Sequence, residues 1–231
     1  MNSFSELIAQ TRSRAYAGDV NYGALLISQS PNRVRGNEVS KAFASRIPTT
    51  TFREMLGAAW SLDHHEVRKA AHNDRILKQW FEYAAFDVSH LPEHLTFYRG
   101  GMCFSIDEVP HQTPVSLCWG QSWTLDRDAA CFFATIYAHR TRPSRITGAY
   151  PCVVAIRVPR RYALANFTDR RENEVVAFTR RLRRHIIDGE NIPVAKATIA
   201  SWRPSEELFA EWLAAGERFL AAHSTLPAPD T

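Results

Sequence analysis

The stretch that decides the fold runs from Arg170 to Phe178 and reads Arg-Arg-Glu-Asn-Glu-Val-Val-Ala-Phe. Its second half is typical of a buried strand, because Val and Phe fit a pleated, packed surface. Side chains two positions apart on a strand point the same way, so Glu172 and Glu174 are expected on one face at the entrance of this strand. Two neighbouring carboxylates repel each other, which favours a site that uses them. A solvated strand edge, flanked by the two arginines, is the alternative.

Further strands are predicted on both sides of this stretch. Runs rich in apolar and β-branched residues indicate strands at 95–101, 115–119, 151–158 and 194–200. Residues 125–134 carry Ala and Phe on one helical face, which predicts a helix capped by Asp126 or Thr124.

The first part of the chain is predicted to be mostly helical. Apolar side chains recur at helical spacing over Ser3–Ala17 and again from Thr50 or Thr51 onward. Asp63 is expected to cap a further helix that continues to Ala84. The large aromatic side chains of this part are interpreted as core anchors; they are Trp60, Trp80 and Phe81.

The end of the chain is predicted to form one amphipathic helix followed by a loose tail. Residues 205–223 carry apolar side chains on one face, and Glu206 and Glu207 suit the positive N-terminus of such a helix. The tail, residues 224–231, contains two prolines and no core residue.

Composition indicates an ordinary globular protein of the cytoplasm. The chain is 45% hydrophobic and 23% charged, and no apolar run approaches the ~18 residues of a membrane span. The N-terminus lacks the pattern of a secretory signal. Four separated cysteines in apolar contexts are expected to be reduced core residues, and no metal site is predicted; they are Cys103, Cys118, Cys131 and Cys152.

Positive charge is concentrated in one segment. Between Arg140 and Arg184 there are twelve arginines and three carboxylates, a net charge of +9 in a chain whose total is +4, so the rest carries −5. Such asymmetry indicates a region that meets a polyanion. A solvated basic surface, or a face that binds an acidic inhibitor, is the alternative.

Three short motifs follow one another in the second part of the chain. They are Tyr98-Arg99-Gly100, Ser122-Trp123-Thr124 and Glu172-Asn173-Glu174. In this order, each beside a predicted strand, they resemble the motifs of the Arg–Ser–Glu class of ADP-ribosyltransferases, over about Leu95 to Ser201. The signatures of a P-loop, a dinucleotide-binding loop, a serine hydrolase and a zinc protease are absent. An unrelated α+β domain with a chance match is the alternative.

The resemblance implies roles for the two glutamates and the serine. Cleavage of the nicotinamide–ribose bond of NAD passes through an oxocarbenium-like species, which a carboxylate stabilises. Glu174 takes this part, and Glu172 positions or deprotonates the incoming acceptor nitrogen. Ser122 is expected to hydrogen-bond and orient Glu174 or the ribose.

The resemblance also implies residues that hold NAD. Arg99 binds the diphosphate, because a guanidinium binds phosphate oxygens in a bidentate way. Gly100 leaves room for NAD beside the backbone. Trp123 and Phe132, or Phe133, are expected against the nicotinamide, although core packing suits Phe133 better.

Together these observations predict an α+β protein. A helical N-terminal region, residues 1–94, precedes a mixed, mostly antiparallel two-sheet ADP-ribosyltransferase core with a C-terminal helix, residues 95–223. The expected activity is NAD-dependent mono-ADP-ribosyl transfer to a macromolecule. A nucleic-acid base is slightly favoured over protein arginine as the acceptor, because arginine contacts to phosphate dominate nucleic-acid binding.

Two other functions stay open, namely an NAD glycohydrolase and a non-enzymatic module that binds nucleic acid or a partner. The resemblance implies a toxin-like setting, of the toxin–antitoxin or phage-defence kind, in the bacterial cytoplasm. An antitoxin or inhibitor protein is then an expected partner, and a membrane is not.

Overall fold

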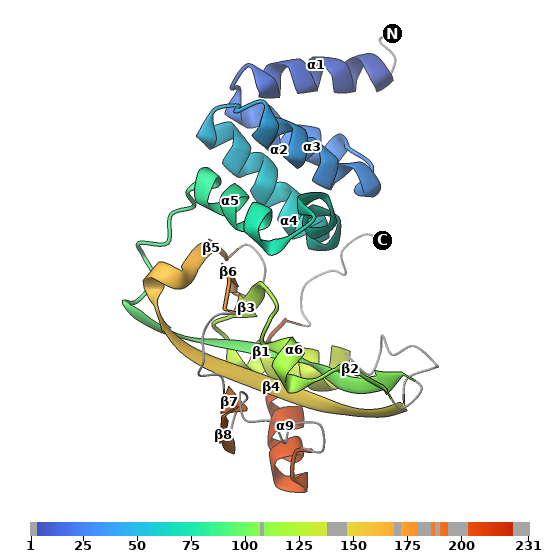
Figure 1. Ribbon diagram of the computed structural model, residues 1–231, viewed down its shortest axis with the longest axis vertical. Coiled ribbons are helices and arrows are strands. Elements are labelled where there is room, and N and C mark those ends of the chain that lie inside the picture. Colours follow the sequence, from blue (N-terminus) through green and yellow to red (C-terminus); the bar gives the residue numbers. More distant parts are fainter. Residues whose placement is uncertain are drawn as a thin grey trace. The chain divides into compact units, whose positions relative to one another are not determined.

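A computed structural model describes residues 4–106, 109–137, 147–168, 172–179, 186–187, 190–193 and 203–223. The chain divides into two compact units, Met1–Val88 and Ser89–Thr231. The first is helical and the second holds a sheet with helices, so the protein is of the α+β class (Figure 1). The division precedes the predicted boundary at 94/95, because Arg160 at the end of a long strand binds the backbone of Ser89 and Leu91.

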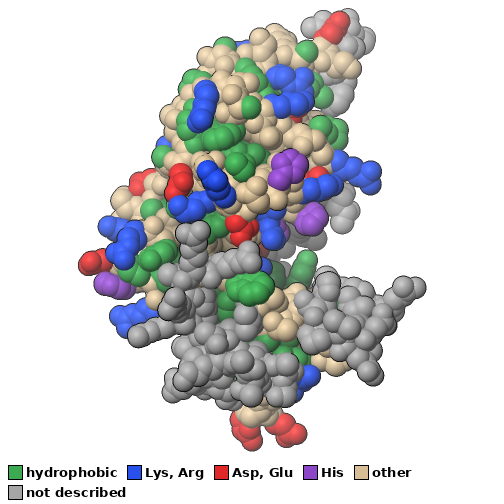
Figure 2. Space-filling view, in the orientation of Figure 1, with side chains coloured by type: hydrophobic (Ala, Val, Ile, Leu, Met, Phe, Trp, Pro, Cys, Tyr) green, Lys and Arg blue, Asp and Glu red, His purple; other side chains and the backbone are tan. Residues whose placement is uncertain are grey.

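Five helices make up the described part of the first unit. They are α1 (Phe4–Tyr16), α2 (Val20–Gln29), α3 (Asn32–Ala44), α4 (Thr49–Ala71) and α5 (Asp74–Ala84). Trp60, Trp80 and Phe81 are almost fully buried in its core. The predicted helical character and aromatic core are therefore confirmed. Charged side chains of both signs are scattered over the face of this unit seen in Figure 2.

The helix predicted from Asp63 to Ala84 is two helices. Asp63 departs from helical geometry, and its Oδ1 accepts from Glu66 N at 3.2 Å, so the predicted cap is confirmed. The helix then ends at His72, whose φ is 61°. Asn73 Oδ1 accepts from Ile76 N at 3.0 Å and starts α5. Continuous apolar periodicity concealed this break, since a side-chain cap acts locally and leaves the pattern intact.

The second unit is built on an antiparallel sheet. Its described strands are β1 (His94–Ile106), β2 (Val109–Gln112), β3 (Ser122–Thr124), β4 (Thr147–Pro159), β5 (Ala163–Phe167), β6 (Glu174–Ala177), β7 (Ile186–Ile187) and β8 (Glu190–Pro193). Their order is β5-β6-β3-β1-β4-β7-β8, with β2 paired to β1 beside this path. Each described pairing is antiparallel.

The expectation of two sheets is wrong for the described strands, which join in one sheet. Strand β1 connects its two halves, because it pairs with β4 from His94 to Ser105 and with β3 at Tyr98. The predicted strand ended at the glycine pair Gly100 and Gly101. The strand instead continues through both glycines, which lie where helices approach the sheet closely.

Residues 115–119, predicted as a strand, belong instead to helix α6 (Pro114–Leu117) and the turn after it. Thr113 Oγ1 accepts from Ser116 N at 3.2 Å, and Ser116 Oγ accepts from Thr113 N at 2.8 Å. This reciprocal capping box, with Pro114 at the first helical position, starts a helix in spite of the apolar run.

The remaining described helices are α7 (Arg127–Phe132), the π-helix η1 (Phe133–Tyr137), the 3-10 helix η2 (Arg160–Tyr162) and α9 (Glu206–His223). Asp126 Oδ1 accepts from Asp128 N at 2.8 Å, which confirms the predicted cap of α7. Helices α6 and α9 lie on opposite faces of the β1–β4 ribbon (Figure 1). Gly216 lets α9 pack closely against η1, since a Cβ at Gly216 would lie 2.9 Å from Oγ1 of Thr135 in η1.

Two predicted segments, residues 194–200 and the tail 224–231, lie outside the described residues. Among the helices of the described ranges, none has the length and apolar character needed to cross a membrane. The four cysteines, all within the described residues, are buried and not joined in disulfides, as expected.

Candidate active site

The two glutamates of the Glu-x-Glu motif do not share one face of a strand. Strand β6 begins at Glu174, and Glu172 lies in the turn before it. Between them Asn173 has a φ of 47°, a left-handed conformation that Asn adopts more readily than most residues. This bend removes the alternation on which the prediction depended. Glu174 is 1% exposed, whereas Glu172 is half-buried.

Ser122 and Glu174, 52 positions apart in the chain, are joined by a hydrogen bond. Ser122 Oγ donates to Glu174 Oε1 at 2.6 Å, a distance typical of a hydroxyl that donates to a carboxylate. Strands β3 and β6 bring them together, because Thr124 pairs with Glu174 and so places Ser122 on the same face. The contact that the sequence predicted for Ser122 is present.

Arg99 contacts the backbone of Ser122, and its side chain leaves β1 on the face of the sheet opposite Glu174. Its Nη1 donates to Ser122 O. Tyr98 pairs with Thr124, so the next side chain, Arg99, points away from the face of Thr124. The guanidinium lies against Gly120, where a Cβ would be 2.1 Å from Arg99 Cζ. Arg99 thus secures the first residue of β3, and Gly120 provides the space.

Thr124 links the second and third motifs. Its Oγ1 donates to Glu172 O and accepts from Asp126 N at 2.9 Å. The hydroxyl therefore holds the turn before β6 against the start of α7. Thr124 therefore supports this turn, beside the helix that Asp126 caps.

Gly100 does not leave room for a ligand. A Cβ at Gly100 would lie 1.7 Å from Ala130 O, so the backbone of α7 occupies the space beside it. A Cβ at Gly101 would meet Leu117 Cδ1 of α6 at 2.8 Å. The expectation that Gly100 admits NAD is corrected: the glycine is required because α7 packs directly on β1.

We expect Gly100→Ala to destabilise the protein by roughly 3 kcal/mol and Gly101→Ala by about 1 kcal/mol. The first methyl group meets backbone atoms that cannot turn aside, whereas the second meets the end of a flexible leucine side chain. Urea denaturation of the two variants and the native protein measures the difference. Equal stability of the two variants would contradict the packing role given to Gly100.

Two residues expected against the nicotinamide are packing residues. Trp123 is 2% exposed, and its Nε1 donates to Gly120 O at 3.0 Å, so its expected role in binding NAD is corrected to a role in the core. The ring of Phe132 lies 5.4 Å from that of Phe133 and 5.3 Å from that of Phe219. These contacts account for Phe132 as part of the packing between α7 and α9.

Burial argues against a cysteine nucleophile near this site. Desolvation raises the pKa of Cys118 to about 12, although the positive charge of Arg99 acts in the opposite direction. Burial also raises the pKa of Cys152 well above its ordinary value. Since the thiolate is the reactive form, burial disfavours both thiols as nucleophiles.

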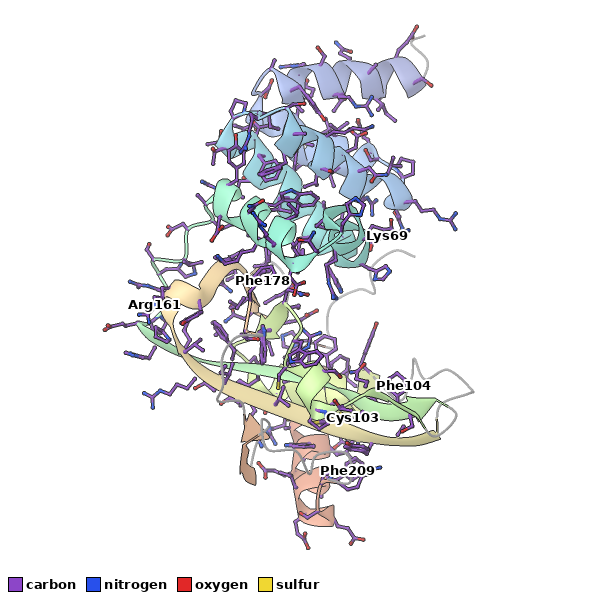
Figure 3. The ribbon with its side chains drawn as sticks, viewed as in Figure 1. Lys69, Cys103, Phe104, Arg161, Phe178 and Phe209 are labelled. Carbon is purple, nitrogen blue, oxygen red and sulfur yellow. The ribbon has the colours of Figure 1, made fainter. Side chains whose placement is uncertain are left out.

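The structure describes three of the twelve arginines of the basic segment. Arg160 has a structural role, since its Nη1 donates to Ser89 O and Leu91 O, each at 2.7 Å. Arg161, labelled in Figure 3, is exposed in the turn between β4 and β5, and Arg157 is also exposed. The other nine lie outside the described residues: Arg140, Arg142, Arg145, Arg170, Arg171, Arg180, Arg181, Arg183 and Arg184.

The sequence prediction missed Asn166, a residue of β5 that contacts the third motif. Asn166 Nδ2 donates to Asn173 Oδ1 at 2.9 Å and to Glu174 O at 3.1 Å. Asparagine is depleted in strands, so its presence within the run from Ala163 to Phe167 was a signal that a polar contact was needed there.

Comparisons with known proteins found no relative of this chain. No family model matches the chain, and neither the curated proteins nor the solved structures include a significant match. The candidate active site is therefore defined by the chain's own contacts: the buried pair Ser122–Glu174, Arg99 on the carbonyl of Ser122, and Glu172 in the adjacent turn.

Proposed function

We propose that the protein is an NAD-dependent mono-ADP-ribosyltransferase that modifies a macromolecule. The observation that carries the proposal is the bond from Ser122 Oγ to Glu174 Oε1 at 2.6 Å, made by a glutamate that is only 1% exposed. A fold tolerates a buried carboxylate where hydrogen bonds satisfy it, and such groups gather at functional sites. The pairing joins the second and third motifs of the resemblance.

The reaction breaks the bond between C1′ of the ribose and the nicotinamide nitrogen. The electron pair of that bond moves to the nicotinamide ring, which leaves neutral, and positive charge develops on the ribose. The carboxylate of Glu174 stabilises this charge, as in glycoside cleavage. Ser122 holds one carboxylate oxygen and so limits the directions in which Glu174 can point.

An acceptor nitrogen then attacks C1′ and loses a proton. Glu172 is the proposed base, because it lies in the turn next to Glu174 and not within the buried strand. Its half-buried position suits a group that must meet a macromolecule.

Arg99 has two functions in this proposal. It secures Ser122 through the carbonyl oxygen, and from there, although its side chain leaves β1 on the face opposite Glu174, it is proposed to contribute positive charge for the diphosphate of NAD. A guanidinium carries five N–H donors, so it can bind more than one oxygen atom at the same time. Trp123, Phe132 and the backbone beside Gly100 have packing roles and do not hold nicotinamide in this proposal.

A nucleic-acid base is the proposed acceptor. The support is the net charge of +9 over Arg140–Arg184, opposite in sign to the phosphate backbone of RNA and DNA. Arg160 contributes structure to this segment, so the proposal depends on the other arginines.

A nicotinamide-release assay tests the proposal. The purified protein is incubated with NAD alone, with RNA, with DNA and with a protein extract, and labelled ADP-ribose is followed in each fraction. We expect nicotinamide release with label on nucleic acid. Release with no labelled macromolecule indicates that water is the acceptor, and label on protein alone contradicts the nucleic-acid acceptor. Absence of release in all four mixtures contradicts the enzymatic function.

A further inference from the structure

We propose that Asn166 is a positioning residue for Glu174, because its side-chain amide holds the bend from which Glu174 enters the sheet. Asn166 lies on β5, the strand next to β6, and belongs to none of the three motifs. The inference rests on the proposed function, since positioning affects a rate only if Glu174 takes part in the reaction.

The amide of Asn166 binds both residues at the bend. Its Nδ2 donates to Asn173 Oδ1 at 2.9 Å and to Glu174 O at 3.1 Å. An amide nitrogen carries two hydrogens, so both bonds can form together. On its other side, Asn166 Oδ1 lies 3.0 Å from Nε2 of the exposed His90. Because Oδ1 only accepts, this contact requires a proton on Nε2 of His90, and it keeps Nδ2 directed toward β6.

The bend itself needs such support. Asn173 has a φ of 47°, a left-handed conformation that is sparsely populated even though Asn adopts it more readily than most residues, so surrounding contacts help to hold it. From the β3 side, Leu125 N donates to Asn173 O at 3.3 Å, and Thr124 Oγ1 donates to Glu172 O. Asn166 supplies the bonds from the β5 side. Without its amide, the bend would lose these two side-chain bonds from the β5 side.

The direction of the Glu174 side chain depends on this bend. Glu174 is the first residue of β6, so a rotation at Asn173 moves its Cα–Cβ bond directly. The bond to Ser122 Oγ at 2.6 Å allows little displacement before it is lost. A catalytic group misplaced by 1 Å costs about 10²-fold in rate. The effect should fall on the chemical step, since the described contacts of Asn166 lie at the bend and at His90.

Steady-state kinetics of nicotinamide release test this role. We expect Asn166→Ala to lower kcat by about 10²-fold while KM for NAD changes by less than about threefold. Asn166→Asp has the same size but lacks the amide hydrogens, so it should lose kcat to a similar extent. Combined with Glu174→Gln, Asn166→Ala should add no further loss, because both changes act on one group.

Leu164→Ala is the matched control, since Leu164 is a half-buried residue two positions earlier on β5. It should weaken the strand and leave kcat per folded molecule unchanged. Hydrogen exchange at the Leu125 amide reads the bend without reference to activity, and we expect about tenfold faster exchange in Asn166→Ala but not in Leu164→Ala.

The two proposals fail in different ways. If the unmodified protein releases nicotinamide and Asn166→Ala has the same kcat, the positioning role alone is overturned. An equal loss of kcat in Leu164→Ala, or unchanged Leu125 exchange in Asn166→Ala, also overturns it, because the role would then be general to the strand. A native protein that releases no nicotinamide overturns the proposed function and this inference together.

Discussion

Glu174→Gln is expected to slow nicotinamide release by about 10³-fold, because glutamine keeps the size of the side chain but removes the charge that faces the developing cation. The loss should be the same with RNA, with a protein extract or with water as the acceptor, since cleavage of NAD precedes the choice of nucleophile. The Ser122 hydroxyl can still donate to the amide oxygen, so the fold should persist. Circular dichroism and thermal denaturation check this.

Glu172→Gln is the companion variant. It should abolish transfer to the macromolecule and leave slow hydrolysis by water, because Glu172 lies in the turn outside β6 and is proposed to act on the acceptor alone. The bond from Thr124 Oγ1 goes to the backbone oxygen of Glu172 and survives the substitution. Normal transfer by Glu172→Gln would leave Glu174 as the one catalytic carboxylate of the motif. Full NAD turnover in both variants would remove the basis of the enzymatic proposal.

Arg99→Ala is expected to weaken NAD binding by roughly 10- to 100-fold, the loss that corresponds to a hydrogen bond between charged groups. The same change removes a donor from Ser122 O, so it should also lower the free energy of unfolding by about 1 kcal/mol. Calorimetric titration with NAD and urea denaturation measure the two effects separately.

Arg99→Lys separates the two functions of the arginine. A lysine ammonium can donate to Ser122 O and restore part of the stability, but it lacks the planar fork that binds phosphate in a bidentate way. We therefore expect near-native stability with NAD affinity close to that of Arg99→Ala. Native NAD affinity in Arg99→Ala would remove the diphosphate role and leave Arg99 as a support of β3 only.

Local sequence signals determined much of the architecture. Apolar periodicity over Ser3–Ala17 and over residues 205–223 predicted α1 and α9, because a helix that covers a core must repeat its apolar face. Asp63 and Asp126 were predicted as caps for a reason equally local: a carboxylate accepts from backbone N–H groups two or three residues ahead. The order of the three polar motifs also pointed to Arg99, Ser122 and Glu174 as neighbours.

Long-range pairing decided what those signals left open. Strand β1 pairs on both edges, which joined two expected sheets into one, and the register at Tyr98 turned Arg99 to the face opposite Glu174. Gly100 was expected to make room for a ligand, yet the backbone of α7 fills that room. Such outcomes depend on which distant element packs against a residue, and the residues next to it in the chain do not determine that element.

The bend at Asn173 shows the same division most clearly. In the sequence, Glu172 and Glu174 are two positions apart, so on a regular strand they would share a face. In the structure, the amide of Asn166 and the N–H of Leu125 hold Asn173 in a left-handed conformation and end that alternation. The sequence by itself determined which carboxylates to consider. The tertiary structure decided which one is buried against Ser122, because hydrogen bonds from two other strand regions set the backbone between them.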